Sequence, residues 1–232
     1  MRFLFIIQGE GRGHLTQFIA MCQMLTEAGH EVVGVMVGKS PARQLPNFFL
    51  RQMQLPIYPF ESPNFLPTAK NKQVCLMRSL AYNVLRVPKF LRSMHYIQQI
   101  IRESEVDVVV NFYELLTGLT YLVYRPKAVL VCVAHQYLFL HPDFEFPRAN
   151  RLSLFSLRLF TRVTASGATK RLALSSQPID PSPFRHWVQQ ANWLILREFR
   201  EDILRSDVAY TWWDNLSMVL TNRMVRLLSH IG

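Results

Sequence analysis

The sequence predicts an α/β fold in which a parallel sheet is covered by helices on both faces, followed by a helical C-terminal tail. Short apolar runs alternate with helical stretches along most of the chain. The runs are rich in β-branched residues, as in strands that are buried on both faces of a sheet. The first strand, helix and strand fit within residues 2–37, which is the size of one parallel unit with a right-handed crossover.

The elements follow from this rhythm in chain order. Strands are expected at 2–7, 31–37, 106–111, 129–134 and 171–175, and helices at 14–28, 114–124 and 150–162. The proline-rich section 41–67 predicts strand fragments and loops, and residues 72–102 predict one or two amphipathic helices broken near Pro88. Beyond Gln177 the strand signal fades, and all four tryptophans occur there. We therefore divide the chain into a Rossmann-like domain at 1–177 and a helical tail at 178–232.

The composition limits the class of protein. Half of the 232 residues are hydrophobic, which excludes global disorder, and no apolar run is long enough to span a membrane. The apolar start of the chain ends at Gln8 without a cleavage site, so we interpret it as a strand and not as a signal peptide. The three cysteines are far apart in apolar contexts, which predicts buried thiols in a reducing cytoplasm and neither disulfides nor a zinc site.

The positive charge is concentrated in the first domain. Residues 1–177 hold 20 Lys and Arg against 10 Asp and Glu, whereas residues 178–232 hold six of each. No acidic residue occurs between Glu61 and Glu103, although seven basic residues do. Such a surface could attract nucleic acid, an anionic membrane or a phosphorylated substrate.

A glycine-rich turn, Gly9-Glu10-Gly11-Arg12-Gly13-His14, separates the first strand from the first helix. Glycines there let the chain turn sharply and let a diphosphate approach the N-terminus of the helix. The third glycine comes one residue too early for the dinucleotide pattern, and no acidic residue ends the second strand to hold a ribose. We therefore do not expect NAD or FAD to bind.

His14 adds a chemical group to this turn. It begins the helix at the carboxyl edge of the sheet, where α/β folds bind ligands. An imidazole can take a proton from a hydroxyl group near neutral pH. The alternative role is a capping or packing histidine; because His14 follows three glycines, we favour the functional role.

The turn, together with Leu15 and Ala20, resembles the glycine-rich entry loop of GT-B glycosyltransferases. Within that family, the chain is most similar to the peptidoglycan N-acetylglucosaminyltransferase and to the glucosyl- and glucuronosyltransferase group. The similarity covers residues 1 to about 175. Segments 107–113, 132–136 and 149–174 are similar to later strands and helices of that domain. The glycine–histidine loop is its specific part.

The resemblance implies the N-terminal, acceptor-binding half of a two-domain enzyme. His14 would be the catalytic base, and a loop of Gly9, Gly11, Arg12 and Gly13 would face the donor phosphates. The acceptor-side cleft would include Asn111, Glu114, His135 and Gln136. The nucleotide-sugar domain of such enzymes has no counterpart here, because the tail 178–232 is too short and too poor in glycine and strands. Two alternatives follow: a partner chain carries that domain in a split enzyme, or the sequence is a truncated or frame-shifted product.

Histidines and carboxylates near these segments have alternative roles. Glu114 follows a strand and could either orient an acceptor or satisfy the start of a helix. His135 and His141, with Asp143 and Glu145 beyond them, have no metal-site spacing, so we expect a polar loop lining the cleft and no metal.

The basic segment predicts a surface that faces anionic lipid. Arg86, Lys89 and Arg92 alternate with apolar residues at helical spacing, and the alternative is a core-packed helix with a basic outer face. No nucleic-acid motif accompanies these residues.

We expect hexosyl transfer from a nucleotide sugar, as co-substrate, to a hydroxyl acceptor, with no further cofactor, on the cytoplasmic side of a membrane. The alternative is a non-catalytic subunit that binds the acceptor or the membrane within a split enzyme.

Overall fold

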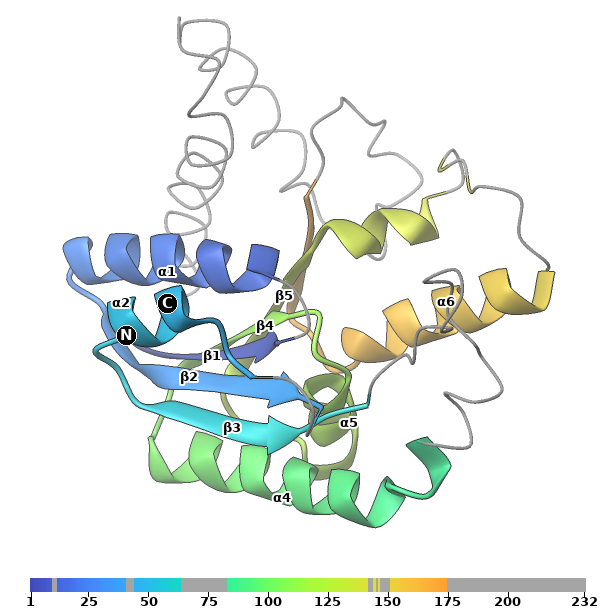
Figure 1. The fold of residues 1–232 in the computed structure, drawn as a ribbon, viewed down its shortest axis with the longest axis horizontal. Coiled ribbons are helices and arrows are strands. Elements are labelled where there is room, and N and C mark those ends of the chain that lie inside the picture. The colour runs from blue at the N-terminus through green and yellow to red at the C-terminus, as the bar shows by residue number, and fades with distance from the viewer. Residues whose placement is uncertain are drawn as a thin grey trace, which may run out of the picture.

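A parallel sheet forms the centre of the protein in the computed structural model (Figure 1), which describes residues 1–9, 12–40, 44–63, 83–141, 144, 146 and 151–174. Within these residues the sheet has six strands in the order β3-β2-β1-β4-β5-β6. They are β1 (Arg2–Gln8), β2 (Glu31–Lys39), β3 (Ile57–Glu61), β4 (Val108–Phe112), β5 (Val129–Ala134) and β6 (Lys170–Ala173). All neighbouring strands are parallel. This is the doubly wound order of Rossmann folds, with the direction of winding reversing between β1 and β4.

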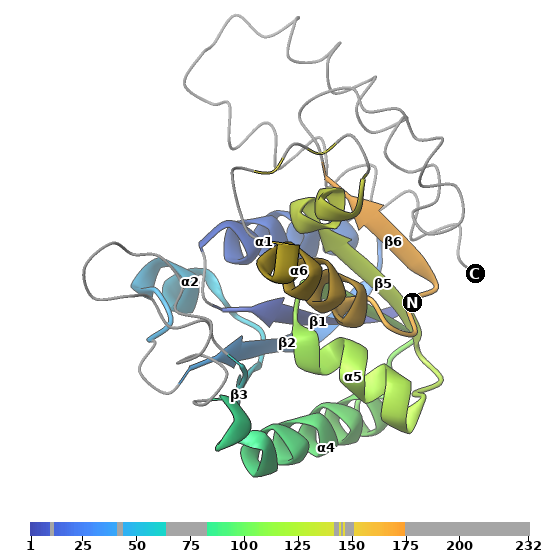
Figure 2. The ribbon, with the colours of Figure 1, turned by 90° about the vertical axis from the view of Figure 1, so that its right-hand side faces the viewer.

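Helices cover both faces of this sheet. Helix α1 (Arg12–Glu27) and the short α2 (Asn47–Gln52) lie on one face, and α4 (Val87–Glu103) lies on the other (Figure 1). Helices α5 (Leu115–Tyr124) and α6 (Arg151–Thr164) continue from α4, each packed against the previous one (Figure 2). A short 3₁₀ helix, η1 (His135–Leu140), follows β5 directly.

Alternation along β1 explains why the sheet is covered twice. Phe3, Phe5 and Ile7 point into the core beneath α1, while Leu4 and Ile6 point into the core beneath α4 and α5. All five side chains are fully buried. A strand that is apolar on both faces needs a helical layer on each side, which is the arrangement that the sequence predicts.

Within residues 1–177, the predicted strands and helices are confirmed within a few residues at their ends. The proline-rich section 41–67, predicted as strand fragments and loops, contains the helix α2 as well as β3. The expected strand at 129–134 coincides with β5, and that at 171–175 is β6 shifted by one or two residues. The predicted break near Pro88 is confirmed: residues 83–84 are helical, 85–86 form a turn, and α4 begins at Val87. Pro88 lies in the first turn of α4, where its missing N–H costs nothing. The predicted helical tail at 178–232 and the predicted helical residues 72–82 lie outside the described residues.

Candidate functional site

Three chain segments meet at the carboxyl edge of the sheet beside the reversal point. They are the start of α1 after β1, the turn after β4, and the start of η1 after β5. In the parallel register Gln8 lies beside Gly38 of β2, and Ile7 lies beside Phe112 of β4. The residues that follow these strand ends therefore share one edge, which is where open α/β sheets bind ligands.

Gly9 serves the packing of the turn. Its N–H donates to the Gly38 carbonyl at 2.7 Å. A Cβ at Gly9 would lie 2.7 Å from Val37 Cγ1 and 3.0 Å from that carbonyl oxygen, so a larger residue would push the turn away from β2.

Gly13 is different, since a Cβ there would meet no atom within 4 Å. It is exposed in the first turn of α1. Gly11 and the side chain of Arg12 lie outside the described residues. The phosphate-binding role of the loop therefore stays a prediction.

His14 lies in the first turn of α1 and is only 8% exposed. Its ring centroid is 5.9 Å from that of Phe112 and 6.3 Å from that of His135. Its Nδ1 is 3.3 Å from Gln17 Oε1, one turn along the same helix. The structure thus brings together His14 and His135, which are 121 positions apart in the sequence.

Burial sets the charge of His14. Desolvation lowers its pKa from 6.5 to about 4; the hydrogen bond with Gln17 opposes this change, and the charge of His135 adds to it. Above that pH the ring is neutral and one of its nitrogens has a free lone pair. His14 is therefore in the protonation state that a general base requires at neutral pH.

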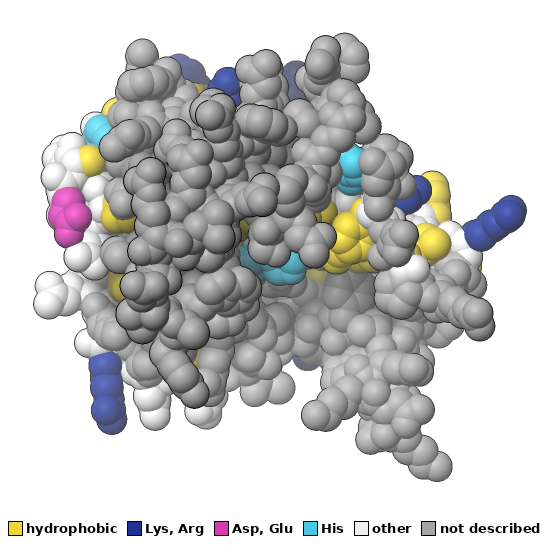
Figure 3. Space-filling view, turned by 90° about the horizontal axis from the view of Figure 1, so that it is seen from above, with side chains coloured by type: hydrophobic (Ala, Val, Ile, Leu, Met, Phe, Trp, Pro, Cys, Tyr) yellow, Lys and Arg dark blue, Asp and Glu magenta, His cyan; other side chains and the backbone are white. Residues whose placement is uncertain are grey.

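His135 opens η1 and is exposed, and partial desolvation by the surrounding protein lowers its pKa as well. Gln136 beside it is half-buried, and its Oε1 accepts no hydrogen bond from the described residues. In a view onto α1, histidine side chains reach the surface beside hydrophobic ones (Figure 3). His135 therefore supplies a polar group next to His14.

The Asn111 side chain is not exposed in a cleft; it forms buried hydrogen bonds that connect several elements. Its Nδ2 donates to the Thr164 carbonyl at 2.9 Å and to the Glu114 carbonyl at 3.2 Å. Its Oδ1 accepts from the Glu114 N–H at 2.9 Å. With the Asn111 side chain fully buried, these bonds tie the end of β4 to the end of α6.

Glu114 is the N-cap of α5, accepting from the Leu116 N–H at 3.2 Å, and it also accepts from the Ser62 hydroxyl at 2.6 Å. It is 1% exposed. A Cβ on Gly38 would lie 2.2 Å from Glu114 Oε2, so the absence of a side chain at Gly38 makes room for the carboxylate. This geometry favours the helix-start alternative for Glu114 over direct contact with an acceptor.

Several contributors to this edge carry no sequence signal of their own. Gln17 could have been found from its spacing, because positions three apart share a helix face. Ser62 could not, since it reaches Glu114 across 52 positions. Tyr113 adopts a left-handed backbone with φ 59°, which is uncommon for a bulky residue and redirects the chain after β4.

The predicted lipid-facing cations divide into two groups. Arg86 and Lys89 both pair with Glu61 at the end of β3, the lysine at 3.4 Å. Arg92 is exposed on α4, and none of the ion pairs found among the described residues involves it. The sequence did not predict the pairs because Glu61 lies 25 positions before Arg86.

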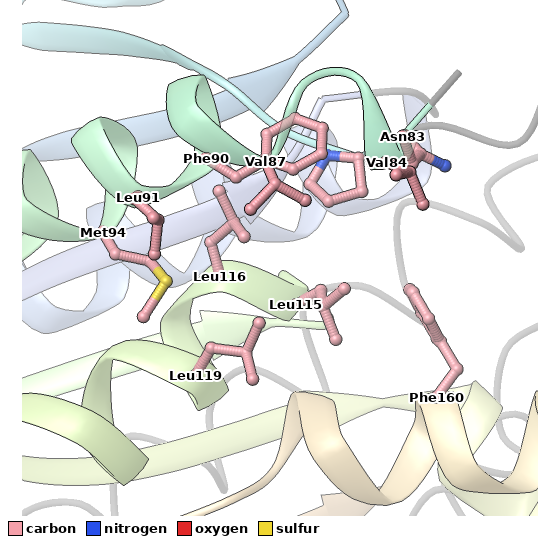
Figure 4. A pocket seen from close by; sticks show the side chains of 11 residues that line it. Asn83, Val84, Val87, Phe90, Leu91, Met94, Leu115, Leu116, Leu119 and Phe160 are labelled. Carbon is pink, nitrogen blue, oxygen red and sulfur yellow. The ribbon is translucent and has the colours of Figure 1, made fainter. Parts of the chain in front are cut away.

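An apolar cavity of about 330 Å³ opens beside these cations (Figure 4). Side chains from α4, α5 and α6 form its walls, among them Val87, Leu91, Leu115, Leu119 and Phe160. Nearby Leu85 is 84% exposed.

The described residues contain neither a metal-binding cluster nor a membrane-spanning helix. No three or more potential metal ligands form a group among them. No helix in this part of the chain is long and apolar enough to cross a bilayer.

No protein-family model matches the chain, and no curated protein matches its sequence. Solved structures with a similar fold include MurG of Acinetobacter baumannii, at 14% identity and a TM-score of 0.43, covering 77% of this chain and 43% of that one. The SsfS6 glycosyltransferase of Streptomyces sp. SF2575 is 15% identical with a TM-score of 0.44, covering 77% and 52%. A Listeria monocytogenes protein assigned as a UDP-N-acetylglucosamine 2-epimerase is 14% identical with a TM-score of 0.47, covering 74% and 39%. The chain thus spans about half or less of the length of each, and these likenesses concern the fold alone.

Proposed function

We propose that residues 1–177 are the acceptor-side domain of a glycosyltransferase that transfers a hexosyl group from a nucleotide sugar to a hydroxyl acceptor. The observation that carries the proposal is the neutral, buried His14 at the reversal point of the sheet, next to the exposed His135. Its position after a glycine turn, at a helix N-terminus, places a base next to a site suited to a diphosphate.

The reaction follows from these groups. His14 takes the proton of the acceptor hydroxyl while its oxygen forms a bond to the anomeric carbon of the donor. The bond from that carbon to the diphosphate oxygen breaks, and the electron pair leaves with the diphosphate. Backbone N–H groups of the loop at Gly11 and Gly13 stabilise the leaving charge. A diphosphate near His14 also raises the pKa of the ring, because an opposite charge favours the imidazolium form.

A donor-binding domain completes this scheme, and we propose that a partner chain supplies it. The alternative is a non-catalytic subunit that only binds the acceptor or the membrane. Transfer measured with the full chain, alone and with candidate partner chains that carry a donor-binding domain, separates the two. The product is detected by mass spectrometry as an acceptor heavier by one sugar residue.

In that assembly, His14→Ala is expected to slow transfer by roughly 10²–10⁴-fold, the usual contribution of a general base. His95→Ala is the matched control, because His95 is an exposed histidine on α4. An unchanged rate for His14→Ala would return the residue to a packing role. No transfer with any of a panel of nucleotide sugars would favour the non-catalytic alternative.

We further propose that the start of α4 faces an anionic membrane on the cytoplasmic side and brings a lipid-linked acceptor to the site. Exposed apolar residues and cations stand together there, as they do on helices that lie in a membrane interface. Because Glu61 neutralises part of the charge of Arg86 and Lys89, Arg92 contributes most to the attraction.

Sedimentation with vesicles tests this surface. We expect binding to anionic but not to zwitterionic vesicles, with release as salt approaches ~0.5 M and screening shortens. Arg92→Glu is expected to weaken binding several-fold and the triple change of Arg86, Lys89 and Arg92 to Glu to abolish it. Leu85→Ser should also weaken vesicle binding. The matched controls, Lys127→Glu for Arg92→Glu and Leu50→Ser for Leu85→Ser, should leave vesicle binding unchanged. Equal binding to both kinds of vesicle, or to neither, would contradict the proposal.

A further inference from the structure

The hydrogen-bond partner of His14 determines which of its nitrogens can act. His14 Nδ1 lies 3.3 Å from Gln17 Oε1, and an amide oxygen can only accept a hydrogen bond. Nδ1 therefore carries the hydrogen, and Nε2 carries the free lone pair. Positions three apart on a helix are neighbours, so the backbone of α1 itself holds the two side chains together.

The surroundings restrict the ring further. Phe112 of β4 and His135 of η1 both lie against it, with interplanar angles of 32° and 23°. His135 is the titratable group of the described residues whose charge acts on His14; the side chain of Arg12 lies outside that part. The ring is thus packed between neighbours and fixed at one nitrogen.

We infer that Gln17 is a positioning residue that holds His14 in the tautomer with an unprotonated Nε2. The inference rests on the proposed role of His14 as base. An amide orients the ring without adding charge, whereas a carboxylate at the same place would orient it and also favour the imidazolium form. An uncharged partner therefore keeps His14 neutral until the substrate arrives.

The opposite orientation of the amide gives the opposite result. If the NH₂ group of Gln17 donated to His14 Nδ1, the hydrogen of the ring would lie on Nε2. His14 would then present a donor to the acceptor hydroxyl and could not remove its proton. The two arrangements differ in a property that can be measured directly.

Side-chain ¹⁵N NMR of the full chain without substrate decides between them, with His14→Ala identifying the His14 signals. We expect Nδ1 protonated and Nε2 unprotonated in the wild type. Gln17→Leu should populate both tautomers, and Gln17→Glu should keep the Nδ1–H form and raise the His14 pKa by about 1 unit or more. Gln23→Leu is the matched control, since Gln23 bonds Glu27 on the same helix.

A protonated Nε2 in the wild type would overturn the inference, as would an unchanged tautomer and titration in Gln17→Leu. Thermal unfolding run in parallel shows whether each variant folds; if Gln17→Leu does not, the response of Gln17→Glu decides alone. In a transfer assay we expect Gln17→Leu to lower kcat about tenfold with little change in KM. The tautomer is measured without substrate, so the inference about Gln17 can hold even if no sugar is transferred. Conversely, sugar transfer with a protonated Nε2 would overturn the inference and leave the proposed function in place.

Discussion

At the scale of single residues, the folded protein suppresses the charge of His14. The ring is 8% exposed, lies at the positive end of a helix and faces a second histidine. Each of these conditions disfavours the imidazolium, and desolvation is the largest. In the unfolded chain none of them acts, so folding and protonation compete.

Because folding and protonation of His14 compete, the free energy of unfolding is expected to fall in acid. Because the pKa falls from 6.5 to about 4 on folding, the unfolded chain binds more protons between these values, and stability is lost as pH drops through this range. Between pH 7 and pH 5 this one group should cost about 2 kcal/mol of unfolding free energy. Denaturant unfolding of wild type and His14→Gln at both pH values measures it. The variant should lose less stability than the wild type, and equal losses would show that His14 titrates normally.

At the scale of elements, α5 and α6 are joined by a close approach at Gly118. A Cβ there would lie 2.0 Å from the Val163 carbonyl oxygen and 2.9 Å from the backbone of Thr164. The Thr164 carbonyl also accepts from buried Asn111. The contact therefore links the end of α6 to the turn that follows β4.

Gly118→Ala is expected to destabilise the fold by about 3 kcal/mol or more, because backbone and not a flexible side chain stands in the way. Gly13→Ala is the matched helical control: its Cβ meets nothing within 4 Å, so it should be neutral or gain up to about 1 kcal/mol. Chemical denaturation of both variants gives the comparison. A small loss for Gly118→Ala would mean that α6 can move away without cost.

Some of these structural features could be predicted from the sequence and others could not. Strands such as β5 were predictable because apolar runs and their boundaries are local signals. His135 was placed in the cleft by the resemblance alone, and its contact with His14 is explained by the rule that parallel strands end at one edge. The contacts of Asn111 with Thr164 and of Glu61 with Arg86 depend on how helices pack across the sheet, and no local pattern encodes them. For this reason Asn111 and Glu114 were predicted as cleft residues although both are buried joints.

At the scale of the whole molecule, the chain carries a net charge of +10, and the carboxyl edge of its sheet holds a neutral base. A positive field attracts anions such as a diphosphate or a lipid phosphate, and the reversal point between β1 and β4 offers a place for them. We therefore propose that this edge binds the reacting groups of a nucleotide sugar and its acceptor.

Titration of the full chain with UDP-glucose, followed through the histidine side-chain NMR signals, tests this proposal. With no donor-domain partner added, we expect weak binding that saturates in the millimolar range, which corresponds to about 4 kcal/mol. The signals of His14 and His135 should shift together while that of His95 on α4 stays in place, and the His14 pKa should rise in the complex. If His14 and His135 do not respond at saturating nucleotide sugar, or shift no more than His95, the edge is not the site of transfer.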